Sequence, residues 1–431
     1  MISVYVIAAI LLAIAIGYKS KINTGFFAIA FAYLLGCFVL NLKPAEVIRM
    51  WPMGIFFVIA MVSLFYNFAL INGTLEKLSL HILYRCRRIP YLLPLVIYFA
   101  AALIAALGAG FFSVMAFSAP LALLLCDKIK MNKLVGAVAV NCGALSGANF
   151  MTSGSGVIFR GLMDNAGYTQ SSFQFSAVIF AASVLFSLLL IAGFLWGMKS
   201  TRNLKRIDDM EKPEPFDAKQ RLNLKLMLVM IALVLVPPIA HILFPGNALL
   251  ALINSKVDVG LIAVVMSLIA MSLRLAPQKE VVARIPWETL IMICGVGILI
   301  SVAIKAGTID LLAGWVSTSI PLGLVPLVFT LIAAFMSFFS STLGVVCPAL
   351  FPLIPSVAQS TGITPILLFT CIVIGGQASA ISPFSSGGSL ILGSLAHDAE
   401  RDEVFPRLLF LVVPVSVVSA GLFCLAMSQI L

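Results

Sequence analysis

The sequence has 431 residues, of which 61% are hydrophobic and only 10% are charged, and its formal net charge is +10 at pH 7. Soluble domains are about one-quarter charged, so this composition excludes an ordinary water-soluble protein and indicates a polytopic membrane protein. In a soluble protein the positive charge would suggest nucleic acid or another anionic partner. In a membrane protein it is explained first by the orientation of the loops, and no nucleic-acid partner is expected.

Apolar runs that can cross the bilayer as helices, about 18 residues or longer, recur along the whole chain. The first run is interpreted as a membrane span, because no small-residue signal cleavage site follows it. After the third span comes an amphipathic segment over 74–90, and then a helical hairpin over 90–127. In the first half we expect spans near 3–17, 24–40, 52–71, 134–149 and 173–197.

The second half repeats this order after a hydrophilic segment over 199–225, which is interpreted as a solvated linker. Its amphipathic segment is "TIDLLAGWVSTSIP" and its hairpin covers 321–357. The second arm of the first hairpin, "VMAFSAPLALLLC", has only about 13 residues, or ~20 Å of helix. We therefore expect both hairpins to be re-entrant. The spans of the second half are expected near 226–244, 259–275, 287–304, 364–380 and 407–429.

Internal similarity supports a tandem duplication. "SKINTGFFAI" is echoed by "SKVDVGLIAV", and "GALSGANFMTSGSGVIFRG" pairs with "GGQASAISPFSSGGSLILG" with five identities in 19 positions. Four such blocks keep an offset of 228 to 235 residues. We predict an all-α protein with repeat 1 over 1–198, the linker over 199–225 and repeat 2 over 226–431. Each repeat contains five spans, one re-entrant hairpin and one broken helix, the broken helices covering 134–166 and 364–396.

Five crossings per repeat are an odd number, so the two repeats have inverted topology. With the N-terminus outside, 22 of the 27 Lys and Arg residues fall on one side of the membrane. This asymmetry follows the positive-inside rule and predicts a cytoplasmic linker with both termini extracytoplasmic. A hairpin that spans with both arms would give the same sidedness.

Polar residues interrupt the apolar pattern at four matched places. They are the hairpin tips around Ser113 and Ser340 and the breaks "SGANFMTSGSG" and "ASAISPFSSGGS". Transporters built from inverted repeats hold substrate where broken helices expose their ends. Hydroxyls there can replace the hydration of an ion or carboxylate, and helix N-termini favour an anion. Serine and glycine also serve as close-packing residues in membrane helices, but four matched interruptions favour a cavity lining.

Individual polar residues leave alternatives open. Arg160 lies in the first broken segment, either as a carboxylate partner or as an arginine that snorkels to the outer interface. Asn141, Asn149 and Gln377 offer amide contacts to a ligand or to a neighbouring helix. The eight cysteines are scattered and are interpreted as small core hydrophobes, and the three histidines are too far apart in sequence to favour a metal site.

The absence of certain motifs limits the function. Every acidic residue lies in a loop, a linker or the end of a span, which disfavours a carboxylate-relay antiporter and leaves no constellation for an intramembrane enzyme. The sequence has no Walker-type phosphate loop for ATP. Coupling to Na⁺ at hydroxyls and backbone carbonyls remains open, as do uniport and proton coupling, and no cofactor is expected beyond such an ion.

The stretches "IGYKSKINTGFFAIAFAYLLGCF", "LFYNFALINGTLEKL", "APLALLLCDK" and "GAVAVNCGALSGANFMTSGSGVIF" resemble the MatC-type dicarboxylate carrier family over nearly the first 170 residues. The whole plan resembles the wider ion transporter superfamily, which includes divalent anion/sodium symporters. The resemblance implies re-entrant hairpins, a scaffold that forms a homodimer, a mobile transport domain, and elevator-type access to a small dicarboxylate.

In those symporters each hairpin tip carries Ser-Asn-Thr, which the second tip, Ser340-Ser341-Thr342, nearly matches. The first tip, Phe112-Ser113-Val114, departs from it, and the proline pairs typical of the broken spans are missing. We thus expect a secondary active carrier of malonate or a C4-dicarboxylate in a bacterial inner membrane, or alternatively an ion antiporter or inorganic-anion exporter. The expected substrate contacts are Ser113, Asn149, Thr152, Ser153, Arg160, Ser340, Ser341, Thr342, Ser385 and Ser386. The expected ion contacts are Ser146, Gly147, Ser341, Thr342, Ser379 and Ser382.

Overall fold

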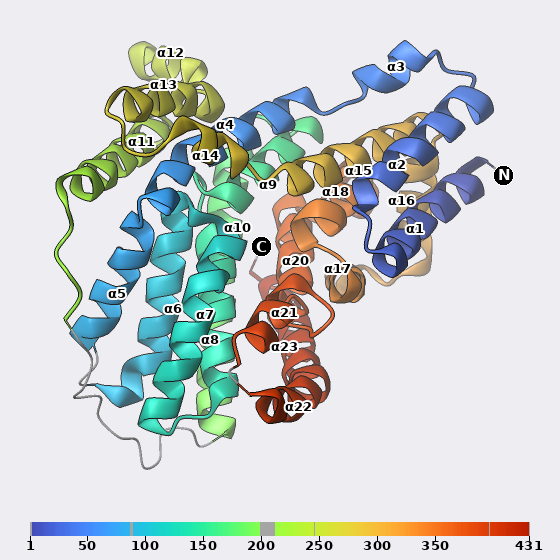
Figure 1. Ribbon diagram of the computed structural model, residues 1–431. Coiled ribbons are helices and arrows are strands. Elements are labelled where there is room, and N and C mark those ends of the chain that lie inside the picture. The colour runs from blue at the N-terminus through green and yellow to red at the C-terminus, as the bar shows by residue number, and fades with distance from the viewer. Residues whose placement is uncertain (1, 87–88, 199–211, 245, 396, 431) are drawn as a thin grey trace.

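A computed structural model describes residues 2–86, 89–198, 212–244, 246–395 and 397–430 (Figure 1). These residues form helices and loops, and none of them lies in a β-strand. Among them, eight helices are long and apolar enough to cross a membrane, and the bent pair α12 and α13 passes the same test jointly. The chain is therefore an all-α, multi-pass membrane protein.

Every span expected from the sequence coincides with a helix. The first half contains α1 (Ile2–Ser20), α2 (Thr24–Tyr33) continued by η1 (Leu34–Val39), α3 (Pro44–Arg49), α4 (Met53–Ile71), α5 (Thr74–Cys86), η2 (Pro90–Leu92), α6 (Leu93–Ile104), η3 (Ala105–Ala109), α7 (Gly110–Ile129), α8 (Lys133–Ala148), α9 (Gly154–Asn165) and α10 (Ser172–Gly197).

The second half begins with a longer helix than expected. It contains α11 (Ala218–Leu243), α12 (Ala248–Lys256), α13 (Val259–Ser272), α14 (Gln278–Ala283), α15 (Trp287–Lys305), α16 (Thr308–Ser319), η4 (Leu322–Leu324), α17 (Val325–Phe339), η5 (Thr342–Val346), α18 (Cys347–Leu350), η6 (Phe351–Leu353), α19 (Ile354–Thr361), α20 (Pro365–Ala378), α21 (Ser386–Gly393), α22 (Asp398–Arg407), η7 (Leu408–Val412) and α23 (Val413–Met427). The short helices α3, α12, α14 and α22 were not expected.

Three expectations need correction. The first hairpin bends at Gly108 and Gly110, with φ of +94° and +70°, rather than at Ser113, because glycine adopts positive φ without steric cost. Its second arm, α7, has 20 residues rather than about 13. The linker ends earlier than expected, because Asp217 caps α11 by accepting from the Gln220 N–H at 2.7 Å. Residues 199–211 of the linker lie outside the described residues.

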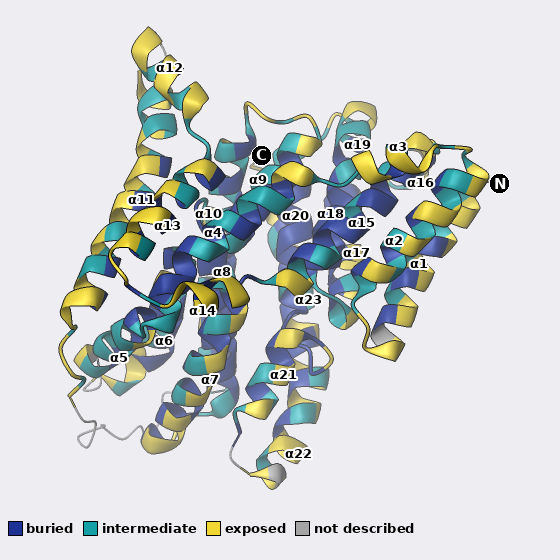
Figure 2. Cartoon of the chain, turned by 45° about the horizontal axis from the view of Figure 1, so that its top comes forward, coloured by how far each residue is buried: buried dark blue, intermediate teal, exposed yellow. Residues whose placement is uncertain are grey.

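The centre of the molecule is formed by α8 and α20, which are buried along nearly their whole length, whereas α12 has no buried residue (Figure 2). The hairpin helices α6 and α7 pack on α8, α17 packs on α20, and α10 contacts both central helices. Because other helices surround α8 and α20, polar groups at their ends face protein rather than lipid.

Glycines let the hairpins approach the central helices closely. A Cβ added at Gly143 would lie 2.4 Å from the backbone oxygen of Tyr98, and one at Gly375 would lie 2.2 Å from that of Thr330. Small residues at such positions are typical of tightly packed membrane helices. The contact between hairpin and central helix is thus made by backbone in both halves.

A second group of helices surrounds this centre. Here α2 pairs with α15 and α4 pairs with α13, so each pair combines one helix from each half. In Figure 1, α1, α2, α15 and α16 lie on one side of the molecule and α11 to α14 on the other. The two halves are therefore interlocked rather than placed side by side.

Candidate functional site

The two central helices are each followed by a break in the helical backbone. The first lies between α8 and α9, and the second between α20 and α21. Inside a membrane protein such backbone is tolerated where it is buried in protein or lines a wet cavity. The Ser153 hydroxyl donates to the backbone oxygen of Ala105, and the Ser379 hydroxyl donates to that of Ala334 at 2.7 Å. Each break is therefore bonded to the hairpin of its own half.

The second hairpin tip leaves helical geometry at Ser340 and Ser341, where the sequence predicts it. Ser340 is extended, with φ −136° and ψ −176°. The Ser341 Oγ accepts from the Gly344 N–H at 3.1 Å and caps the next helical turn. The Thr342 and Ser337 hydroxyls are 2.6 Å apart. Local hydrogen bonds thus hold the tip open.

A cavity lies between this tip and the start of α21. It offers about 50 Å³ to water-sized molecules, room for only a few of them. The first turns of α9 and α21 both contribute to it, through Ser155 in α9 and Ser386 and Gly387 in α21. Its lining consists of Phe111, Phe112, Leu145, Ser155, Thr289, Ser337, Ser340, Ser341, Thr342, Leu343, Gln377, Ala380, Ser385, Ser386 and Gly387.

The electrostatics of this cavity suit an anion. Helix N-termini carry partial positive charge and expose backbone N–H groups. The described residues that line the cavity include no Asp or Glu side chain to repel an anion. Among the described residues, no acceptor is found for the hydroxyl hydrogens of Ser155, Ser341 and Ser386, so these can be donated to a bound oxygen.

A wider vestibule of about 370 Å³ adjoins the cavity. The two spaces share Ser340, Ser341, Ser385 and Ser386. The lining of the vestibule includes the positively charged Lys21 and the negatively charged Glu288, which lies on α15. The Asn23 side chain donates to the Glu288 backbone oxygen at 2.7 Å and fixes the α1–α2 loop to α15. The cavity is thus reached through a polar entrance.

The structure brings together half of the expected substrate residues. Ser340, Ser341, Thr342, Ser385 and Ser386 line the cavity, whereas the remaining five do not. The residues outside its lining are Ser113, Asn149, Thr152, Ser153 and Arg160. Ser113 lies on α7 and is half-buried, and Thr152 and Ser153 are fully buried in the first break.

Arg160 lies on α9, one to two turns beyond the cavity. Its guanidinium carbon is 5.4 Å from the ring centre of Phe173 on α10, a cation–π contact. The Nε and one terminal nitrogen have no hydrogen-bond partner among the described residues. Arg160 is therefore held by an aromatic ring and is separate from the candidate anion cavity.

Of the six expected ion contacts, Ser341 and Thr342 line the cavity. Ser146, Gly147, Ser379 and Ser382 lie outside its lining, in the supporting packing. Ser146 donates to the Tyr98 hydroxyl at 3.0 Å, and Ser382 accepts from the Phe384 N–H at 3.2 Å. At Gly147 an added Cβ would lie 2.0 Å from the Ala102 backbone oxygen. Among the described residues no group of three or more His, Cys, Asp or Glu side chains could hold a metal ion.

Asn149 and Gln377 join the two breaks. The Gln377 Nε2 donates to Asn149 Oδ1 at 2.9 Å, and the Asn149 Nδ2 donates to Gln377 Oε1 at 3.1 Å and to Ser183 Oγ at 2.8 Å. From the sequence, these amides could contact either a ligand or a neighbouring helix. The structure places them in an interhelical pair, with Gln377 also lining the cavity.

Three polar residues of the cavity lining, Ser155, Thr289 and Ser337, were not selected from the sequence. Ser155 stands between two glycines in the first break, and the Gly-Ser-Gly pattern is a signal that could have found it. Thr289 lies near the start of α15 in an apolar run, and only the three-dimensional packing of α15 against the second hairpin brings it to the cavity.

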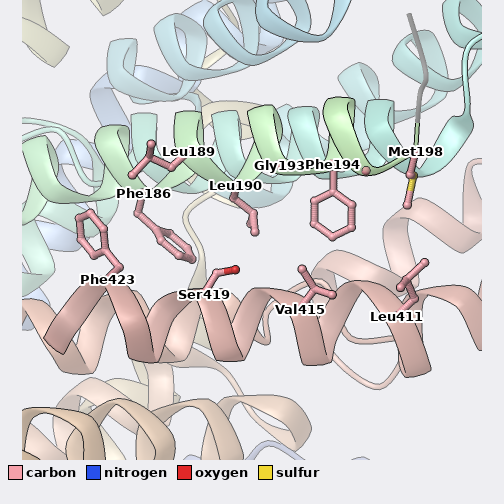
Figure 3. A pocket seen from close by; sticks show the side chains of 11 residues that line it. Phe186, Leu189, Leu190, Gly193, Phe194, Met198, Leu411, Val415, Ser419 and Phe423 are labelled. Atoms are coloured by element: carbon pink, nitrogen blue, oxygen red, sulfur yellow. The ribbon is translucent and has the colours of Figure 1, made fainter. Parts of the chain in front are cut away.

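Two other cavities are less suited to an anion. A groove of about 350 Å³ runs between α10 and α23, and Figure 3 shows apolar side chains from both helices that face one another across it. Ser419 is the single polar side chain among its described lining residues. A cavity of about 540 Å³ between α4, α9, α15 and the second hairpin contains the carboxylate of Asp310, which disfavours an anion.

Comparison with solved structures shows the fold of a transporter. The YdaH transporter of Alcanivorax borkumensis matches with a TM-score of 0.55 and 16% identity, covering 92% of this chain and 87% of that chain. MtrF of Neisseria gonorrhoeae, reported to illuminate a class of antimetabolite efflux pumps, matches with a TM-score of 0.54 and 14% identity, covering 91% and 83%. A search among curated proteins finds no significant sequence match.

The sequence also matches a family model described as the N-terminus of the dicarboxylate carrier protein MatC. The match covers residues 1–148 and 229–380, which is well over half of the chain. Family and fold agree on a membrane transporter rather than an enzyme. The chain therefore belongs to the MatC dicarboxylate carrier family.

Proposed function

We propose that this protein is a secondary active carrier of a small dicarboxylate, malonate or a C4-dicarboxylate, driven by Na⁺ or H⁺. The observation that carries the proposal is the cavity in which the N-termini of α9 and α21 meet the hydroxyls of the second hairpin tip. Backbone N–H groups and hydroxyl hydrogens are the donors that a carboxylate requires.

The proposed site includes one carboxylate position. Ser341, Thr342 and Ser386 surround it, and Ser155 approaches from the other break. The second carboxylate of the substrate would face the vestibule, where the ammonium group of Lys21 provides a favourable field. The small volume of the cavity favours short dicarboxylates, since a longer or aromatic anion requires more space.

The distribution of Lys and Arg residues between the two sides of the membrane supports one orientation of the protein. Lys19 and Lys21 lie at the end of α1 near the vestibule, and the positive-inside rule places such residues in the cytoplasm. The proposed site therefore opens inward in this conformation, with both chain termini outside. The two similar structures come from bacteria, which supports a bacterial cytoplasmic membrane.

The proposed mechanism is of the elevator type. The hairpins, broken helices, α10 and α23 would form the mobile unit, and the interlocked pairs α2–α15 and α4–α13 would form a scaffold that dimerises. Support for two inverted repeats comes from the crossed pairing of these helices and from the family match, which falls in two segments at corresponding places in the two halves.

Transport outward is the second candidate, favoured by the likeness to MtrF, which belongs to a class of efflux pumps. An ion antiporter or inorganic-anion exporter on the same fold falls under this alternative. The direction of net flux in a reconstituted system separates the two candidates.

The test is transport in proteoliposomes that contain the purified full chain. Uptake of labelled malonate and succinate is measured with an inward Na⁺ gradient, with a pH gradient, and with neither. We expect accumulation of at least one of the dicarboxylates above protein-free liposomes under one gradient. Failure of both anions to move in either direction would refute the proposed function.

Replacement of Thr342 by Val tests the cavity. Loss of a hydrogen bond to a charged group costs about 1.5–3 kcal/mol, so we expect uptake to fall at least about tenfold. Thr361→Val is the matched control, because the Thr361 hydroxyl donates to Val357 O at 2.7 Å at the end of α19, away from the cavity lining. Equal uptake by the two variants and the unmodified protein would remove Thr342 from the site.

A further inference from the structure

A second, smaller cavity lies behind the proposed anion site. It is enclosed by α8, α10, α20 and α23, and it offers about 10 Å³, which is the space of a single water molecule or small ion. Helices from both halves of the chain contribute to it. Its polar side chains are those of Asn141, Ser187, Gln377 and Ser416.

Two residues in the lining of this small cavity carry a buried side-chain oxygen without a protein partner. Asn141 Oδ1 and Ser416 Oγ have no hydrogen-bond partner among the described residues, and their residues are only 2% and 1% exposed. Burial of an unpaired polar group is costly, and the side-chain oxygen of asparagine can only accept. The walls of the cavity therefore include two buried oxygens without a partner, of which Asn141 Oδ1 requires a donor or a cation and Ser416 Oγ can accept as well as donate.

The small cavity is separated from the anion cavity by a single layer of protein. Gln377 and Leu145 line both spaces. A Cβ added at Gly387, in the lining of the anion cavity, would lie 2.6 Å from Asn141 Oδ1. The C-terminal end of α20 reaches the small cavity through Ala378, whereas the N-terminus of α21 faces the anion cavity. The two helix ends thus place partial negative charge beside one cavity and partial positive charge beside the other.

The charge balance of the two cavities points to a cation. Their described lining residues include no Lys, Arg or His. A carboxylate in the anion cavity would meet only the partial charges of helix N-termini, because the ammonium group of Lys21 belongs to the vestibule lining. A charge without a full counter-charge away from water is strongly unfavourable. Divalent cations in proteins are normally bound by carboxylates, which these cavities lack, so the occupant is monovalent.

We propose that this small cavity binds one Na⁺ ion through Asn141 Oδ1 and Ser416 Oγ, and that the ion compensates the charge of the substrate in the adjacent cavity. The assignment rests on the proposed dicarboxylate function. Half-helix C-termini and side-chain oxygens are the ligands that Na⁺ takes in transporters with broken helices. Because opposite charges attract strongly in a protein interior, each ion raises the affinity for the other by the same factor.

The test begins with Na⁺ alone. The purified full chain in detergent is titrated with NaCl against KCl at constant ionic strength, without carboxylate, and its thermal unfolding midpoint is measured. We expect the midpoint to rise with Na⁺ relative to K⁺, since a ligand of the native state stabilises it. Identical curves in Na⁺ and K⁺ would mean that the cavity holds water only and would overturn the proposal.

Two variants locate the ion. Asn141→Ala and Ser416→Ala should each weaken the apparent affinity for Na⁺ at least about tenfold. Ser176→Ala is the matched control, because Ser176 is also fully buried on α10 and its hydroxyl has no partner among the described residues, yet it does not line the cavity. An unchanged response to Na⁺ in both cavity variants would overturn the assignment.

Ser416→Ala remains informative if the asparagine variant does not fold. Removal of an unpaired buried hydroxyl relieves its desolvation cost, so this variant should unfold at a higher temperature than the unmodified protein in K⁺ and gain less from Na⁺. A variant that gains as much from Na⁺ as the Ser176→Ala control would refute the site.

Malonate separates this inference from the proposed function. Stabilisation by malonate in K⁺ buffer, without any response to Na⁺, would keep the carrier function and reject the Na⁺ site. A response to Na⁺ that Ser416→Ala removes would support the site even where malonate has no effect. With both ligands, we expect malonate to bind more tightly in Na⁺ than in K⁺, and this gain should disappear in Ser416→Ala.

Discussion

The amides of Asn149 and Gln377 connect the two helix breaks at the centre of the molecule. Each amide donates to the other, and Asn149 also donates to Ser183. Asn149 is fully buried, so its polar atoms depend on these partners. A reciprocal pair of this kind fixes the relative position of the breaks and hence the shape of the adjoining cavity.

Gln377→Met should destabilise the protein by about 1–3 kcal/mol, because the buried amide of Asn149 loses its partner for Oδ1 and keeps only the bond to Ser183. The double variant Asn149→Leu/Gln377→Met should cost less than the sum of the two single variants, since it removes both polar groups together. Thermal unfolding in detergent measures all three. Strict additivity of the shifts would show that the two side chains do not depend on each other.

Prediction from sequence at this scale was partial. The second tip followed from a cluster of hydroxyls, and Ser340, Ser341 and Thr342 do lie together. The predicted position of the first tip was wrong by a few residues. The prediction followed the polar residue Ser113, whereas the bend is made by Gly108 and Gly110, which have no side chain to indicate it. The pairing of Asn149 with Gln377 depends on contacts between residues far apart in the chain, which composition and periodicity do not report.

At the scale of elements, the short helix α3 contacts the long helix α15 through a charged side chain. At the start of helix α3, Glu46 Oε2 accepts from the Lys43 N–H at 2.8 Å. The other carboxylate oxygen lies 3.8 Å from Lys305 Nζ at the end of α15. The backbone N–H of Lys43, with a smaller contribution from the charge of Lys305, lowers the pKa of Glu46 below its ordinary value. Helix α3 of the first half is thereby tied to α15 of the second.

This tie should depend on pH. A carboxylate whose pKa is lowered by folding contributes stability above its unfolded-state value, about 4.3, and loses that contribution as the pH falls through the folded value. Glu46→Gln, which can keep the bond to the Lys43 N–H, should unfold at a slightly lower temperature than the unmodified protein at pH 7. The difference should shrink as the pH falls below about 4. A constant difference across this range would contradict the role of the ionised carboxylate.

Long apolar elements were predictable because the thickness of a bilayer sets their length. The spans near 52–71 and 173–197 coincide closely with α4 and α10. The short helices α3, α12, α14 and α22 were missed, since six to ten residues at a membrane surface carry a weak periodic signal. The early start of α11 depends on the Asp217 cap and on Gln220, which donates to the Asn72 backbone oxygen at 3.0 Å.

At the scale of the whole molecule, the crossed pairs α2–α15 and α4–α13 join the halves. This arrangement fits two repeats of opposite orientation, which the distribution of Lys and Arg also favours. The internal sequence matches could suggest a duplication, but which helices of one half contact the other is decided by packing alone.

Thiol labelling tests the orientation. In a cysteine-free background, Lys43→Cys should react from outside intact cells with a membrane-impermeant maleimide, because the α2–α3 connection is expected to be extracytoplasmic. Lys130→Cys, in the connection between α7 and α8, should react only after the membrane is opened. The reverse pattern would invert the proposed topology and place the vestibule on the outer surface.

The joint between Asn149 and Gln377 has one further consequence. Side-chain amides neither gain nor lose a proton in the range of acidity that folded proteins tolerate, whereas the contact between Glu46 and Lys305 ends when its carboxylate is neutralised. Acidification should therefore release the contact between α3 and α15 at a pH at which the amide pair between the two breaks is still intact.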